Sequence, residues 1–170
     1  NPPIVTPPPG VLAVTRTITG QSVSFDMPDM AYDSDHDRLY VVKDTSIAVI
    51  DNASIATGNA SARILSTTIA GPIVSISLDA SNNELYVSNG ASGIFVFGSI
   101  STASGSIAPI RTITITRGNA PIVPSRIFLD TTNSVLYAEL HVGNGSVTDS
   151  IAAFSNPHAL PVGPVSLSVS

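Results

Sequence analysis

The stretch Leu78-Asp79-Ala80-Ser81-Asn82-Asn83-Glu84-Leu85-Tyr86 decides the fold, because the chain carries its pattern three times. The other two copies run from Tyr32 to Tyr40 and from Leu129 to Tyr137. Each copy has an apolar residue, an aspartate, five loop-type residues and then Leu-Tyr. The repeated aspartates, Asp33, Asp79 and Asp130, are separated by 46 and then 51 residues. A period of roughly 40 to 50 residues is typical of repeat architectures.

The residues around each copy predict short antiparallel strands. Runs of β-branched residues alternate with clusters of Gly, Asn, Asp, Ser and Pro, and no segment shows the apolar period of a helix. We expect the aspartate to end one strand and to accept hydrogen bonds from backbone donors in the turn. We expect Leu and Tyr to begin the next strand on opposite faces, one toward the next blade and one toward the rim. The predicted strands are 30–33, 39–43, 46–51 and 62–68 in the first repeat, 73–79, 85–89, 94–98 and 110–116 in the second, and 126–130, 135–140, 150–155 and 165–170 in the third.

Four antiparallel strands repeated about every 45 residues are the blade of a β-propeller. We therefore expect an all-β fold, a β-propeller-like array of three four-stranded antiparallel blades. The repeats span about 21–68, 69–116 and 117–170, within a repeat domain at 14–170. An extra N-terminal strand at Val14–Gly20 and a Pro-rich arm at 1–13 precede them. An arginine marks this extra strand and the fourth strands of the first two repeats (Arg16, Arg63 and Arg111).

The second repeat resembles a known family. Leu85-Tyr86-Val87-Ser88-Asn89, followed by Gly93-Ile94-Phe95-Val96-Phe97, is similar to the YVTN/NHL-type propeller repeats. The resemblance covers about residues 14–170, and the first and third repeats depart from it at Val41-Val42-Lys43 and Ala138-Glu139. Such repeats occur in surface proteins, binding proteins and some hydrolases. The resemblance therefore implies an architecture and leaves the function open.

The number of repeats raises a question of closure. Known propellers have about four to eight blades, and three blades leave two apolar faces without a neighbour. Three explanations follow: the chain is a fragment of a longer propeller, several copies complete a ring, or copies polymerise by exchanging the spare strand or the arm. A compact β fold that is not a propeller is a fourth alternative.

Composition limits the partners and the compartment. Charged residues make up 11% of the chain and the formal net charge is −5, which argues against nucleic acid and anionic membranes as partners. The chain has no cysteine, and no apolar run approaches the roughly 20 residues of a membrane span. Ser and Thr together account for 39 of 170 residues. We expect a secreted, extracellular or cell-surface protein, and the start at Asn1 without Met leads us to expect a processed product.

One segment has the alternate carboxylates that begin a calcium loop: Asp33, Asp35 and Asp37. Arg38 stands where the EF-hand pattern requires glycine, and the other two repeats have uncharged residues in place of these carboxylates. A solvated hairpin turn is therefore the favoured interpretation, with Ca²⁺ as the weaker one.

Three N-glycosylation motifs begin at Asn52, Asn59 and Asn144, all in predicted loops. The Ser/Thr-rich loop Ser99–Ser106 is a candidate for O-linked glycans. The three histidines, His36, His141 and His158, have no neighbour at metal-ligand or catalytic-triad spacing, and no nucleophile-elbow motif is present. We expect no catalytic residue and no cofactor.

These observations favour a non-catalytic structural or adhesive β-repeat protein that assembles with copies of itself, into a filament by strand or arm exchange, and carries glycans. The alternative is a fragment of a lactonase-like or ligand-binding β-propeller. In that class, polar residues of several blades converge on the central channel. The repeated Asp33, Asp79 and Asp130 are the candidates for such a role, although the pattern explains them as turn residues.

Overall fold

The computed structural model describes residues 14–19, 28–91, 93–118, 120–141 and 150–169. Over these ranges the chain consists of strands and one short 3-10 helix, η2, so the predicted all-β class is confirmed. The Pro-rich arm at 1–13 lies outside the described residues. The strands are β1 (Ile18–Thr19), β2 (Met30–Asp33), β3 (Arg38–Lys43), β4 (Ser46–Asp51), β5 (Gly58–Asn59), β6 (Arg63–Thr67), β7 (Ser75–Asp79), β8 (Glu84–Ser88), β9 (Ile94–Gly98), β10 (Gly105–Ile107), β11 (Arg111–Arg117), β12 (Ala120–Asp130), β13 (Val135–His141), β14 (Ser150–Ser155) and β15 (Gly163–Ser168), with η2 (Pro157–Ala159) before β15.

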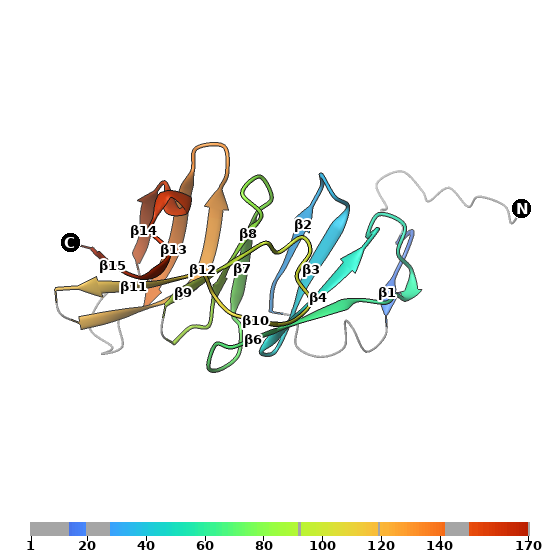
Figure 1. Ribbon diagram of the computed structural model, residues 1–170, viewed down its shortest axis with the longest axis horizontal. Helices are drawn as coiled ribbons and strands as arrows, with labels where there is room; N and C mark the ends of the chain where they lie inside the picture. Colours follow the sequence, from blue (N-terminus) through green and yellow to red (C-terminus); the bar gives the residue numbers. More distant parts are fainter. Residues whose placement is uncertain (1–13, 20–27, 92, 119, 142–149, 170) are drawn as a thin grey trace, which may run out of the picture.

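The strands form three antiparallel units that follow one another along the chain. Unit 1 contains β2, β3, β4 and β6, unit 2 contains β7, β8, β9 and β11, and unit 3 contains β12, β13 and β14. The units stand side by side in an open row, with β1 at one end and β14 toward the other (Figure 1). Four-stranded antiparallel sheets stacked in this way are the building blocks of propellers, so the fold is propeller-like.

The repeated aspartates hold the turns between the first two strands of each unit, as predicted. Each carboxylate accepts hydrogen bonds from backbone N–H groups two or three residues later. Asp79 accepts one from Asn82 at 3.0 Å, and Asp130 accepts from Thr132 and Asn133, both at 3.0 Å. The residue four positions after each aspartate has a left-handed backbone, with φ between 50° and 55° (Asp37, Asn83 and Ser134). This shared geometry explains why the turn tolerates three different sequences.

Acid should weaken the fold through three hydrogen-bonded carboxylates, those of Asp130, Asp37 and Asp51. The Asn133 side chain and the backbone N–H groups of Asn133 and Thr132 lower the pKa of Asp130 below its ordinary value. Hydrogen bonds from Ser54 and from Arg63 likewise lower the pKa of Asp37 and of Asp51. A carboxylate whose pKa is lower in the folded state contributes stability above its unfolded pKa, about 4, and loses it as the pH falls through the folded value.

We therefore expect the free energy of unfolding to be constant near neutral pH and to decrease below about pH 4. Urea titrations at several pH values measure this slope. Asp130→Asn removes one titrating carboxyl, so its slope should be shallower than that of the parent chain. An equal slope in the two proteins would mean that Asp130 contributes nothing to the acid sensitivity.

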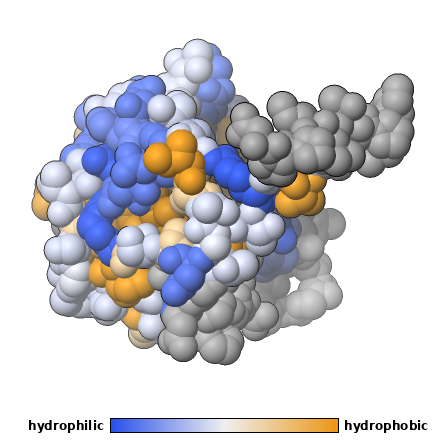
Figure 2. Space-filling view, turned by 90° about the vertical axis from the view of Figure 1, so that its right-hand side faces the viewer, coloured by the Kyte–Doolittle hydropathy of each residue, from blue (hydrophilic) through white to orange (hydrophobic). Residues whose placement is uncertain are grey.

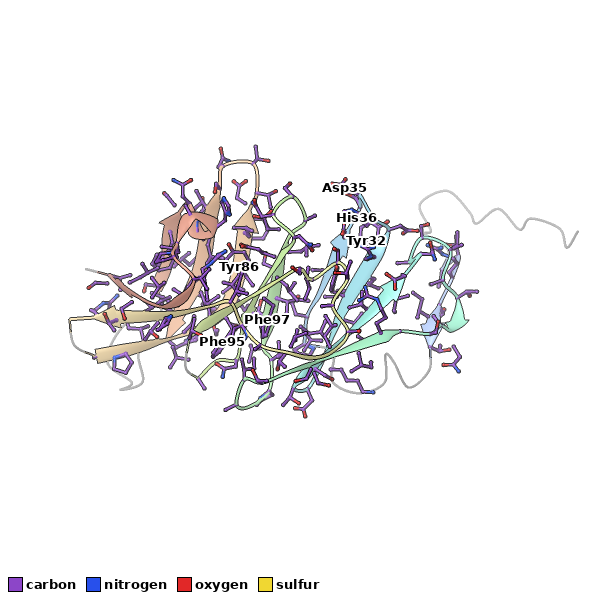
Figure 3. The ribbon with its side chains drawn as sticks, viewed as in Figure 1. Tyr32, Asp35, His36, Tyr86, Phe95 and Phe97 are labelled. Carbon is purple, nitrogen blue, oxygen red and sulfur yellow. The ribbon has the colours of Figure 1, made fainter. Side chains whose placement is uncertain are left out.

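Two apolar clusters fill the spaces between units. The first lies between units 1 and 2 and includes Tyr40 and Leu85, and the second lies between units 2 and 3 and includes Tyr86 and Leu136. Consecutive residues of β8 therefore pack against different neighbours. The expectation that Leu or Tyr faces the rim is wrong, because an inner unit is covered on both of its faces. Figure 3 shows Tyr86 and Phe97 in the middle of the row.

The predicted fourth strand of the third repeat is also wrong. β15 forms no pairing with β14; it runs parallel to β11, with Gly163 opposite Arg111 and Ser168 opposite Thr116. After β14 the chain turns through η2 and crosses to the outer edge of unit 2. There β15 pairs with the side of β11 that faces away from β9. Unit 3 thus has three antiparallel strands among the described residues. Ser170, the last residue of the predicted strand, lies outside them.

A short parallel pairing recurs along the chain: the segment after the third strand of each unit pairs with the strand that precedes that unit. β5 runs parallel to β1, β10 to β6, and β15 to β11. Each of these segments begins at a glycine with positive φ (Gly58, Gly105 and Gly163). β1 therefore has the same position before unit 1 that β6 has before unit 2 and β11 has before unit 3. The spare strand has the position of the fourth strand of a preceding unit.

Candidate functional site

The recurring arginines join each unit to the next one. Arg63 donates from Nε to the Asp51 carboxylate at 3.0 Å, and its guanidinium also donates to the carbonyl oxygens of Ser101, at 3.2 Å, and Ala103. Both carbonyls belong to the loop after β9, in unit 2. Arg111 makes the corresponding contact with the His158 carbonyl of unit 3, at 3.4 Å. The arginine at the start of the fourth strand therefore binds the loop of the following unit.

Arg111 also belongs to a buried polar cluster inside unit 2. Its guanidinium pairs with Glu84, and both residues are buried. The Tyr86 hydroxyl donates to the other oxygen of Glu84 at 3.1 Å. Burial, followed by the neighbouring Glu84 carboxylate, raises the pKa of Tyr86 well above its ordinary value. This cluster connects β8 to β11 within a closed interior, so its evident role is structural.

The outer face of unit 3 exposes apolar side chains and has no neighbouring unit among the described residues. Phe128, Tyr137 and Ile151 are 63%, 38% and 76% exposed, and the two rings lie 6.5 Å apart between centroids. Tyr137 and Ile151 hold the repeat positions of Tyr86 and Ile94, which are fully buried in the cluster between units 2 and 3. Unit 3 thus presents to solvent the side chains that unit 2 uses to pack against unit 3.

A groove of about 850 Å³ lies on this side of the row. Arg126 is exposed there and makes no ion pair among the described residues. Glu139 accepts a hydrogen bond from Ser125 at 3.0 Å and lies 3.7 Å from His141. The groove combines Asp29 just before β2, Ser75 at the start of β7, and apolar and charged groups of unit 3. The lining residues are Asp29, Ser75, Arg126, Ile127, Phe128, Tyr137, Glu139, Ser150 and Ile151.

The edge strand of unit 3 is open as well. β14 pairs with β13 on one side, and no described strand pairs with its other side. In units 1 and 2 that side is covered by β6 and by β11. The Ser150 hydroxyl at the start of β14 is buried and has no hydrogen-bond partner. An open edge of this kind is a template for pairing with another chain.

The opposite end of the row also exposes apolar side chains. Met30 and Tyr32 on β2 are 66% and 53% exposed. Their counterparts in unit 3, Ile127 and Leu129, are buried against unit 2. Figure 2 views the molecule from this end and shows apolar groups among polar ones. Both ends of the row therefore expose positions that the inner interfaces bury.

The three candidate calcium ligands do not share a site. Asp33 is buried and accepts hydrogen bonds from the backbone of Asp35 and His36, both at 3.1 Å. Asp37 instead accepts from Ser54, at 2.7 and 2.6 Å. Asp35 and His36 lie around the turn of the β2–β3 hairpin (Figure 3). Over the described ranges, no three acidic, histidine or cysteine side chains are grouped so that they could hold a metal ion.

We expect calcium to leave the stability of the chain unchanged, because Asp33 and Asp37 are engaged with different donors. Thermal melts with and without millimolar CaCl₂ measure this. A saturable rise in Tm that Asp35→Asn removes would establish a calcium site in this turn. Magnesium at the same ionic strength is the control.

The glycosylation candidates have different surroundings. Asn52 is exposed in the loop after β4, where its φ is 55°. Asn59 is exposed too, but it lies in β5, paired with Thr19, and the prediction of a loop there is wrong. Asn144, and the rest of the loop between β13 and β14, lies outside the described residues. Glycosylation at these sites stays a prediction.

The remaining candidates are engaged in local contacts. His36 binds Asp33 at 2.9 Å, His141 lies in β13 and His158 lies in η2. The repeated aspartates accept hydrogen bonds within their own turns.

No helix in the described part of the chain is long and apolar enough to cross a membrane.

Comparisons with known proteins address the fold. No protein-family model and no curated protein matches the sequence. Among 36 matching chains of solved structures, hydrazine synthase of Kuenenia stuttgartiensis has a TM-score of 0.53 and 15% identity, over 84% of this chain and 37% of that chain. The β-propeller domain of Cps50 (Swd1) from Myceliophteria thermophila has a TM-score of 0.47 and 14% identity, over 82% of this chain and 41% of that domain. The chain spans less than half of either, and such low identities concern the fold alone.

Proposed function

We propose that this chain is a non-catalytic structural protein whose copies associate end to end. The observation that carries the proposal is the exposure, at both ends of the row, of side chains whose repeat counterparts are buried between units. Tyr137 and Ile151 are exposed at one end, beside the exposed ring of Phe128, and Met30 and Tyr32 are exposed at the other. A repeat unit cannot bury its apolar face alone. Contact between the two kinds of end would bury both faces in the way the inner interfaces do.

The contact between unlike ends is heterologous. Such a contact closes into a ring if the rotation between copies permits it, and otherwise grows into a filament. Two copies in a ring would supply six units, within the four to eight blades of known propellers. In a filament, the same contact continues without limit. The row of units in Figure 1 is compatible with a third unit being followed by another first unit.

The composition supports a role outside the cell. Because the formal net charge is only −5 over 170 residues, copies of the chain repel one another weakly. Ser and Thr account for 39 of 170 residues, and Asn52 and Asn59 are exposed. We therefore assign the assembly to a secreted or cell-surface structure, with adhesion as its use and glycans at these asparagines. The resemblance to YVTN/NHL-type repeats is consistent with this assignment.

Negative-stain microscopy of the purified chain tests the proposal. Filaments, or ring-shaped particles built from two or more copies of the 17.4 kDa chain, are expected. Grids that hold no such particles over a wide range of protein and salt concentrations contradict it.

A second candidate is a ligand-binding or lactonase-like propeller of which this chain forms part. The groove favours it, because Arg126, Asp29 and Glu139 bring both signs of charge to one concave surface. Hydrolysis of lactone or ester substrates that Arg126→Gln and Glu139→Gln abolish would support this candidate. The absence of turnover with these substrates, together with filaments on the grid, would favour the structural role.

A further inference from the structure

We infer that β1 of one copy forms the fourth strand of unit 3 in the next copy. The inference rests on the proposed end-to-end association and specifies its contact. In unit 2 this position is filled by β11, which begins Arg111-Thr112-Ile113-Thr114. The sequence around β1 is Arg16-Thr17-Ile18-Thr19, the same four residues in the same order. The open edge of β14 is the place where such a strand is absent among the described residues.

The inner units fix the register of this strand. In units 1 and 2, the arginine of the fourth strand lies opposite Val49 and Val96. Each of these valines lies opposite the repeated tyrosine of the adjacent strand. In unit 3 the residue opposite the repeated tyrosine is Ala153. Arg16 of the incoming strand therefore lies opposite Ala153.

The same register places Thr17 opposite Ala152 and Ile18 opposite Ile151. In unit 2 the corresponding pair is Ile113 and Ile94, and both side chains are completely buried. Ile18 would thus join the exposed apolar set of unit 3, beside Tyr137. Ile18 is only half-buried within its own chain.

No strand has to leave its present partner for this addition. β6 lies between β4 and β10, and β11 lies between β9 and β15. β1 pairs with β5 on one side, and its other side has no partner among the described strands. Ile18, two residues after Arg16, lies opposite Gly58. Leu65, two residues after Arg63 of β6, lies opposite Gly105 in the same way. β1 would lie between β14 of one copy and its own β5, as β6 and β11 already lie between two strands.

Charge complementarity supports the same contact. Asp29, Ser75 and Arg126 hold one repeat position, four residues before the repeated aspartate of each unit. Across the first inner interface, Ser75 donates to Asp29 at 2.7 Å. Continuing the row places Arg126 of one copy beside Asp29 of the next. Arg126, which has no ion-pair partner in its own chain among the described residues, would gain one there.

Disulfide cross-linking tests the strand register directly, because the chain has no cysteine of its own. Residues directly opposite in an antiparallel pair have Cα atoms about 4.5–5.5 Å apart, within the range for a disulfide. Mixing Thr17→Cys with Ala152→Cys under mild oxidation should give linked dimers that contain one chain of each variant. Thr17→Cys mixed with Ala153→Cys is the matched control and should give few, because Ala153 points to the opposite face.

Light scattering on the same samples separates two kinds of failure. Assembly without the Thr17–Ala152 link overturns the strand register and leaves the proposed function standing. The absence of both assembly and link overturns both proposals. Arg126→Glu provides an independent measurement and should weaken association by about tenfold, with Arg126→Lys close to the parent chain. Equal association of the Glu and Lys variants would contradict the contact between Arg126 and Asp29.

Discussion

Replacing Glu84 by Ala should lower the free energy of unfolding by about 3–5 kcal/mol. Glu84 is buried, pairs with the Arg111 guanidinium and accepts the Tyr86 hydroxyl at 3.1 Å. Its removal leaves the positive charge of Arg111 buried without a partner and the Tyr86 hydroxyl without an acceptor. In the unfolded chain water solvates both groups, so the two losses destabilise only the folded state. Chemical denaturation monitored by circular dichroism measures the change.

Asp51→Ala is the matched control, because Asp51 binds the corresponding arginine of unit 1. The Asp51 side chain is 42% exposed, so its removal should cost only about 1 kcal/mol or less. The double variant Glu84→Leu with Arg111→Leu should recover much of the loss, since a buried ion pair is replaceable by apolar groups. Equal losses for Glu84→Ala and Asp51→Ala would show that the Glu84–Arg111 pair is not desolvated as described.

Ile151→Asp should abolish the association of copies while leaving the fold of each copy intact. Ile151 is 76% exposed on the outer face of unit 3, so an aspartate there remains solvated in the isolated chain. In the assembly it would lie opposite Ile18 in an apolar interface, where an unpaired charge costs several kcal/mol. A loss of this size corresponds to at least about a hundredfold weaker association.

Val162→Asp serves as the control for this change. Val162 is 78% exposed, lies between η2 and β15, and is not among the residues that line the groove. Its association should match that of the parent chain. Sedimentation velocity measures association, and the thermal melt confirms the fold. Association of Ile151→Asp at parental strength would exclude this face as the contact between copies.

Local signals in the sequence predicted most of the strands. The turn formed by Asp79 and its equivalents depends on residues within four positions of one another, so the pattern is readable without a structure. The alternation around Tyr86 predicted that Leu85 and Tyr86 lie on opposite faces, but not that both faces are packed against neighbouring units. The same logic placed Arg63 and Arg111 in fourth strands, although the contacts that they make with the next unit's loop are not local.

Long-range pairings were beyond prediction. β15 has the composition of a fourth strand, and only the path of the chain after η2 sends it to β11. β5 and β10 contain two and three residues, too few for a periodic signal. One signal was available: Gly58 and Gly105 stand five and six residues before Arg63 and Arg111.

The residues of the groove were missed for a related reason. Asp29, Ser75 and Arg126 differ in chemistry, so the repeat pattern does not point to them. Aligning the repeats on their aspartates would have placed the three at one position.

The mass of the particles in solution tests the central claim most directly. Light scattering over a series of protein concentrations should give masses that rise as multiples of 17.4 kDa, with Ile151→Asp remaining at one chain. A plateau at two chains would indicate a closed ring, and continued growth would indicate a filament. A single species of 17.4 kDa at every concentration would contradict the account.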